Sequence, residues 1–193
     1  MIGHRPLVCL VVVTLLCASS LGCSRQPCSC PGESEQVAPI EPRLIAFLSR
    51  ARAAHHVADL KEDGNPSQAV AALVEVVDGP IPQIAGIVPP EAREVVADTQ
   101  ARIADFQSRL MQFDDALKRI ATALDQVPEP SYFRGHLFEM RGLVEQRHAA
   151  ELLRTGQSGQ AEKANVRALQ AFETAMQIQA EVIRKAPLDA GQP

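Results

Sequence analysis

Apolar side chains recur every three or four positions from residue 42 to residue 185, with polar side chains between them. This spacing places apolar residues on one face of a helix, and the strict alternation typical of strands is hard to find. We therefore predict an all-α chain. The expected helices cover residues 43–62, 66–77, 90–112, 114–127, 132–155 and 159–185.

Residues that favour helix ends fall at the boundaries of these ranges. Asn65 can cap a helix that begins with Pro66, whose missing N–H costs nothing at that position. Pro90 begins another helix, and Glu91 in its first turn suits the helix dipole. Further N-caps are expected at Ser131 and Ser158, and helix stops at Gly64 and Gly156.

Three of the expected helices share one spacing of small and bulky side chains. In the helix at 114–127, Ala116 and Ala123 flank Ile120, and Pro128 follows the helix. A similar spacing begins at Ala69 in the helix at 66–77. The third copy consists of Ala168, Phe172, Ala175 and Met176. Small residues let a neighbouring helix approach closely, and bulky residues fill its groove.

This spacing resembles the second helix of a tetratricopeptide repeat. The resemblance implies that residues 43–187 form three antiparallel helix pairs in a short tetratricopeptide-like α-solenoid, whose groove binds a protein or peptide. The first helix of each pair carries the family pattern poorly, and the chain has no Trp. An irregular helical bundle built from the same hairpins is the alternative fold.

Residues 1–22 form a predicted signal peptide that is not part of the fold. The apolar run from Leu7 to Leu16 is shorter than the roughly 20 residues that a membrane-spanning helix needs. Residues 20–23 resemble the lipobox of bacterial lipoproteins, which implies lipid attachment at Cys23 and a place in the cell envelope. Because Ser24 stands where lipoproteins of the inner membrane commonly carry Asp, we expect the periplasmic face of the outer membrane. A cleaved secretory signal, with Cys23 as an ordinary thiol, is the alternative.

Residues 23–42 are polar and rich in proline, so we expect a disordered tether, and residues 188–193 a disordered tail. Cys28 and Cys30 form a lone C-x-C pair in this tether. Thiolates bind soft metals and take part in redox reactions, so a metal- or redox-carrying lipoprotein is the alternative function. No second Cys pair follows, and a disulfide or two idle thiols are the simpler interpretation. We therefore expect no metal site and no cofactor.

The composition argues against nucleic acid as a partner. There are 19 basic against 23 acidic residues, and stacking side chains are scarce because the chain has no Trp and one Tyr. No phosphate-binding glycine loop, nucleophile motif or paired zinc histidines occur, so we expect neither an enzyme nor a site for a small-molecule substrate.

Histidines and carboxylates offer few further candidates for chemistry. Glu145 and His148 share a helix face, but a di-iron bundle needs two such pairs, and we expect this one to be solvated. His55 and His56 are adjacent and point in different directions from one helix, so they cannot bind one metal ion together. We expect one of them to be half-buried and the other exposed to water. His136 is a lone imidazole with an expected structural role.

The connection at 78–90 is long for a link between helices and carries four apolar side chains. These side chains must either fold back over a helix edge or remain exposed for a partner to bind. They are therefore the candidate partner-binding residues. They are Ile81, Ile84, Ile87 and Val88. The helices before residue 131 are acidic on balance and the later ones basic, which could orient a protein partner in the envelope.

Overall fold

The computed structural model describes residues 41–186, which belong to the second of the chain's two units, residues 39–193. The described residues form six helices and no strand, so the all-α prediction is confirmed, and each helix end lies within three residues of its expected position. The helices are α1 (Pro42–Lys61), α2 (Pro66–Val77), α3 (Pro90–Arg109), α4 (Phe113–Gln126), α5 (Tyr132–Arg154) and α6 (Ser158–Lys185). The predicted signal peptide, Cys23, the Cys28/Cys30 pair and the tail at 188–193 lie outside the described residues. Within residues 41–186, no helix combines the length and the apolarity that crossing a membrane requires.

Two of the expected N-caps are present. The Asn65 side chain accepts a hydrogen bond from the backbone N–H of Gln68 at 3.1 Å, where α2 begins. The Ser131 hydroxyl accepts one from the backbone N–H of Arg134, also at 3.1 Å, where α5 begins. Each bond satisfies one of the backbone donors that the first turn of a helix leaves open.

The other expected helix ends need correction at two positions. Ser158 is the first residue of α6 and not its cap, because Gln157 takes the cap position without a side-chain hydrogen bond. Gly64 does not stop α1, which already ends at Lys61. Gly156 does follow the end of α5 with φ of 78°, a left-handed conformation that glycine adopts without strain.

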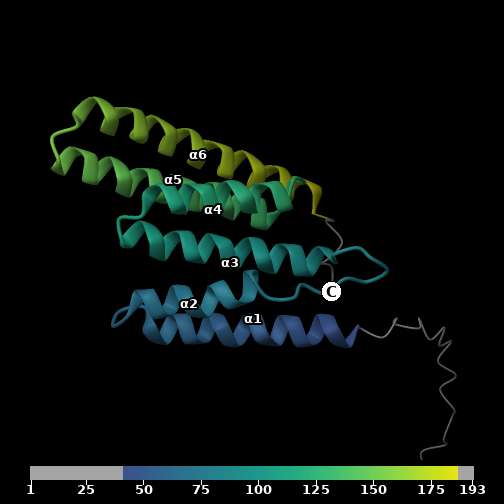
Figure 1. Cartoon of the computed structure of the whole chain (residues 1–193). Helices are drawn as coiled ribbons and strands as arrows, with labels where there is room; N and C mark the ends of the chain where they lie inside the picture. The colour runs from purple at the N-terminus through teal and green to yellow at the C-terminus, as the bar shows by residue number, and fades with distance from the viewer. Residues whose placement is uncertain (1–40, 187–193) are drawn as a thin grey trace, which may run out of the picture. The chain divides into compact units, whose positions relative to one another are not determined.

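Helices that follow one another in the sequence pack side by side (Figure 1). The hairpins are α1 with α2, α3 with α4, and α5 with α6; α3 also contacts α1 and α2, and α5 also contacts α3 and α4. Among the described helices, α6 contacts α5 alone. Among the described helices, therefore, each pair contacts only the pairs next to it in the sequence.

Helix α3 lies at the centre of the packing. It contributes Ala92 and Val96 to one buried cluster with α1 and α2, and Ile103 and Phe106 to a second. Its Ala97, Ala101 and Ala104 join a third cluster with α4 and α5. The small and bulky residues that suggested the repeat line this third cluster from α4: Ala116, Ile120 and Ala123 are all at most 1% exposed.

The connection between α2 and α3 divides the four apolar residues predicted there into two groups. Ile81 and Val88 fold back and pack against the cluster formed by α1, α2 and α3. Ile84 and Ile87 exchange two backbone hydrogen bonds of 2.8 and 3.0 Å and form a tight turn at the tip of the connection. Their side chains remain 43% and 70% exposed. Within the connection between α2 and α3, only the tip therefore exposes its large apolar side chains.

Candidate functional site

The three pairs contribute side chains to one common surface, which we call the α1/α3/α5 face. A pocket of about 290 Å³ lies on it. Its lining residues are His55 from α1, Asp98, Arg102, Asp105 and Arg109 from α3, and His136, Met140, Leu143 and Arg147 from α5. Larger hollows lie between α1 and α2 and beside the 78–89 connection, but none of these draws on all three pairs. The α1/α3/α5 face is therefore the strongest candidate for a binding site.

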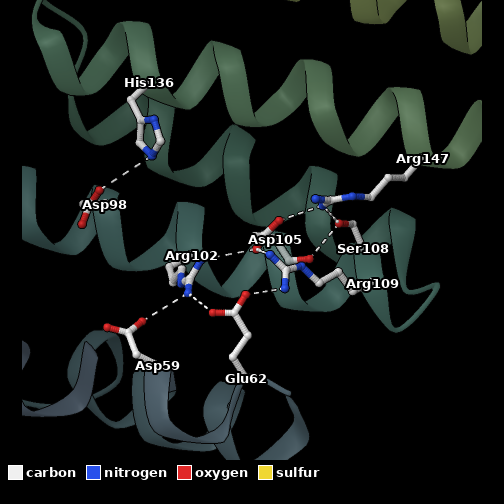
Figure 2. Close-up of polar contacts among 9 residues, drawn as sticks. All are labelled: Asp59, Glu62, Asp98, Arg102, Asp105, Ser108, Arg109, His136 and Arg147. Atoms are coloured by element: carbon white, nitrogen blue, oxygen red, sulfur yellow. Dashed lines mark hydrogen bonds and ion pairs between the residues drawn. The ribbon is translucent and has the colours of Figure 1, made fainter. Parts of the chain in front are cut away.

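A buried carboxylate, Asp105, organises this face. Asp105 is 3% exposed, and removing an unpaired carboxylate from water to this extent costs several kcal/mol. Its Oδ1 lies 2.7 Å from Nη1 of Arg147, and its Oδ2 lies 2.7 Å from Nη2 of Arg109 and 3.5 Å from Nη1 of Arg102. The Ser108 hydroxyl donates to the backbone oxygen of Asp105 at 2.7 Å and accepts from Arg147 at 2.6 Å. Asp105 thus joins α3 to α5 (Figure 2).

The same arginines reach α1. Arg102 Nη2 donates to Glu62 Oε2 at 2.7 Å and to Asp59 Oδ1 at 3.2 Å, and Arg109 donates to the other Glu62 oxygen. This hydrogen bond from Arg109, followed by the charge of Arg102, holds the pKa of Glu62 below its ordinary value. Burial opposes the charged form of Arg109, but its bond to Glu62 and the charge of Asp105 outweigh burial and raise its pKa.

Three guanidinium groups thus face three carboxyl groups, and we call this set the ion network. It consists of Asp59 on α1, Glu62 directly after the end of α1, Arg102, Asp105 and Arg109 on α3, and Arg147 on α5. Asp59 is 62% exposed and Arg109 40%, so the outer groups meet water while Asp105 does not.

Two histidines line the same pocket. His55 Nε2 lies 3.0 Å from the Thr99 hydroxyl, which donates its own proton to the Val95 carbonyl at 2.7 Å, so Nε2 must be the donor to Thr99. His55 is half-buried and its neighbour His56 exposed, which confirms the expectation for this pair. His136 extends from α5 towards Asp98 on α3, with 3.9 Å between Nε2 and Oδ1.

The sequence interpretation of Glu145 and His148 as a solvated pair is wrong. Glu145 is 2% exposed, and its two oxygens accept hydrogen bonds of 2.7 and 2.8 Å from Arg167 on α6. His148 is half-buried and stacks on Phe113, with 4.6 Å between ring centroids. The reason is that α6 folds back along α5 and covers the carboxylate, which the spacing along α5 alone does not show. The two side chains do not meet as a metal site.

Sequence reasoning missed the ion network entirely. The one local signal is the spacing of Arg102, Asp105 and Arg109, which puts opposite charges three and four residues apart on one helix face. Such spacing usually indicates an exposed helix surface. The partners Glu62 and Arg147 come from about 40 residues away on either side, and only the packing of α1 and α5 on α3 brings them in.

Metal chemistry has no candidate centre in this part of the chain. Within residues 41–186, no three His, Cys, Asp or Glu side chains are grouped so that they could hold a metal ion. The Cys28/Cys30 pair and Cys23, the predicted site of lipid attachment, lie outside the described residues.

No protein-family model matches the chain, and no curated protein or solved structure matches it either. The class that fold and site define is that of an all-helical protein with a network of ion pairs on one face. The resemblance to tetratricopeptide repeats stays a prediction.

Proposed function

We propose that this protein is a non-enzymatic lipoprotein of the bacterial cell envelope whose helix pairs bind a segment of another protein. The α1/α3/α5 face is the binding surface, and the lipid on Cys23 is the membrane anchor. The single observation that carries the binding role is the ion network, because it presents side chains of all three pairs on one face. A protein that binds one specific partner needs a surface whose side chains several helices hold in place before binding.

The chemistry of the face indicates what kind of segment it takes. Arg102 and Arg109 can each bind a carboxylate of a partner, and Asp59 and Asp98 can each bind a cationic group. Met140 and Leu143 provide apolar contact within the same pocket. A peptide segment with mixed charges and one apolar side chain fits this surface better than a small metabolite, since a shallow pocket without a deep cavity encloses little of a small ligand.

A photo-cross-linking experiment in bacterial cells tests the binding face. A photoreactive amino acid replaces Glu139, which is 49% exposed and lies beside His136 at the edge of the pocket. The matched control carries the same group at Thr122, an exposed position on α4 away from the face. We expect one discrete protein adduct from position 139 that is absent at position 122. Identical adducts at both positions, or none at position 139, would exclude the α1/α3/α5 face as the binding surface.

The anchor is tested separately, because a protein can bind a partner without being lipid-modified. Metabolically supplied labelled fatty acid should enter the wild-type protein in a bacterial host, and Cys23→Ala should abolish both labelling and membrane retention. Ser24→Ala is the matched control and should keep both. If Cys23→Ala stays in the membrane fraction, the apolar run at the start of the chain is an uncleaved anchor and the lipoprotein assignment is wrong.

A further inference from the structure

The connection between α2 and α3 contains a long stretch without charge. From Gly79 to Pro90, none of the residues is Asp, Glu, Lys or Arg, although these four types make up 22% of the chain. The turn between α1 and α2, in contrast, begins with Glu62 and Asp63. Loops that face only water are ordinarily polar. An uncharged connection that also exposes apolar side chains at its tip is therefore a candidate for contact with something other than water.

Both arms of this connection are held against the helices. Arg50 on α1 donates to the Pro80 backbone oxygen at 2.8 Å, and Ile81 and Val88 pack against the cluster of α1, α2 and α3. Proline occupies positions 80, 82, 89 and 90, and its fixed φ restricts the arms further. Because the arms are held in this way, the exposure of the tip is a fixed feature of the fold.

The tip presents two isoleucines on the same side. Two backbone hydrogen bonds pair Ile84 directly with Ile87 across a turn formed by Ala85, with φ of 50°, and Gly86, with φ of 80°. Side chains of a directly opposed pair lie on one face. The same bonds satisfy the N–H and C=O groups of both isoleucines, which lowers the cost of moving them out of water.

The tip lies at the end of the helices where α1 begins. The hollow beside the connection is lined by Arg43 and Phe47 from the first two turns of α1 and by Ile81 from the connection. Figure 1 shows the connection reaching beyond the helices at this end. Eighteen residues separate Pro42, the first residue of α1, from Cys23, and a flexible chain of that length spans about 25 Å. A lipid on Cys23 would therefore keep this end near the membrane surface.

We propose that Ile84 and Ile87 insert into the boundary between the headgroups and the acyl chains of the membrane, and so orient the helices on it. This inference rests on the lipid anchor of the proposed function. Two isoleucines alone bind a bilayer weakly, and the anchor supplies the local concentration that they need. A protein that meets the membrane with this end keeps the sides of its helices, the α1/α3/α5 face among them, open to a partner.

Charge at this end is balanced. Three basic and three acidic residues line the hollow beside the connection, pair with a residue that does, or lie within three residues of the uncharged stretch. They are Arg43, Arg50, Arg93, Glu41, Asp78 and Glu91. Apolar contact must therefore provide the binding. We expect the tip to enter bilayers of neutral and of anionic lipid alike, and to stay there at high salt.

A single introduced tryptophan tests the contact, because the chain has no Trp of its own. Ile87→Trp places the probe at the tip. Leu60→Trp is the matched control, since Leu60 near the other end of α1 is 70% exposed, as Ile87 is. The lipid-modified full-length protein from a bacterial host is bound to vesicles of phosphatidylcholine, alone or mixed equally with phosphatidylglycerol. Bromine on the acyl chains quenches a tryptophan that contacts them.

We expect brominated lipid to quench the fluorescence of Ile87→Trp, and its emission to shift to shorter wavelength on both kinds of vesicle. Leu60→Trp should show neither effect. Adding Ile84→Asp to Ile87→Trp should abolish the quenching while the protein still floats with the vesicles, because a carboxylate then faces the acyl chains. Circular dichroism should show that Ile84→Asp, at an exposed position, keeps the helical content.

The anchor and the tip fail in different ways. A lipid-modified protein that floats with the vesicles but shows no quenching of Ile87→Trp overturns this inference alone. A protein without lipid overturns the anchor and this inference together. Equal quenching of Leu60→Trp, or quenching that requires anionic lipid or is lost at high salt, would also overturn the uncharged contact at the tip.

A protein partner for the tip is the other outcome to be separated. A photoreactive amino acid in place of Ile87, illuminated in bacterial cells, should give an adduct with the added mass of a phospholipid. A discrete adduct with another protein, or one of twice the mass of the chain, would show that the tip binds protein and would overturn the proposal.

Discussion

The ion pair between Glu145 on α5 and Arg167 on α6 permits a quantitative test of how this hairpin is held. Both oxygens of Glu145 accept from Arg167, and the Glu145 side chain is 2% exposed. Arg167→Met leaves a carboxylate in the α5–α6 seam without its cation. Breaking a fully buried pair costs about 3–5 kcal/mol. The Arg167 side chain is 42% exposed, so water reaches the pair, and we expect about 2 kcal/mol.

The assay is chemical unfolding followed by far-ultraviolet circular dichroism, because the chain has no Trp and only one Tyr for fluorescence. The double variant Glu145→Met/Arg167→Met removes both charges and should recover stability to within about 1 kcal/mol of the wild type. Arg184→Met, an exposed arginine on the same helix, is the control and should change stability by less than about 0.5 kcal/mol. If Arg167→Met costs no more than Arg184→Met, or the double variant is less stable than Arg167→Met, Glu145 is not a buried anion in solution.

Three further predictions concern other parts of the molecule. Ala123→Arg should cost at least about 3 kcal/mol because Ala123 is fully buried, while Thr122→Arg on the exposed side should cost under about 0.5 kcal/mol; equal thermal midpoints would contradict the repeat register. The pKa of Glu62 is lower when folded than its ordinary value of 4.5, so its stabilisation is present above that value and is lost as pH falls through the folded pKa. Chemical unfolding at about pH 5 and pH 3 should therefore show a smaller acid loss for Glu62→Gln than for the wild type, and an equal loss would contradict the bond from Arg109. Asn65→Ala should lower stability by about 1 kcal/mol in the same assay while Asn65→Asp keeps it, and equal effects would rule out the side-chain cap.

Local patterns were sufficient to predict the helices. The three-to-four residue period and the caps at Asn65 and Ser131 depend on residues close in sequence, so each helix could be predicted almost to its ends. Ser158 shows the limit of this reasoning. A hydroxyl in the right place predicts a cap, yet the turn after Gly156 is tight enough that the helix already includes Ser158.

The α1/α3/α5 face could not be predicted in the same way, because its chemistry depends on contacts between pairs. The burial of Asp105 results from α1 and α5 packing on either side of α3. The same holds for Glu145, which looks solvated along α5 and is covered only once α6 folds back. Of the four residues predicted as a partner surface, Ile81 and Val88 pack against the helices because the connection doubles back at its tip. Whether Ile84 and Ile87 bind a partner stays a prediction.

Among the described helices α6 contacts α5 alone, and this has a consequence for how the molecule unfolds. Helices α1 to α5 share buried clusters centred on α3, so opening one of them exposes the others. Separation of α6 would expose only its seam with α5, where the buried residues of α6 are five alanines, which give up little apolar area, and Ile178. The amide protons of α6 should therefore exchange with solvent through a partial opening of lower free energy than global unfolding. A protease that cleaves α5 or α6 only when the two helices are separated should gain access through this opening. It would do so before the buried clusters around α3 unfold.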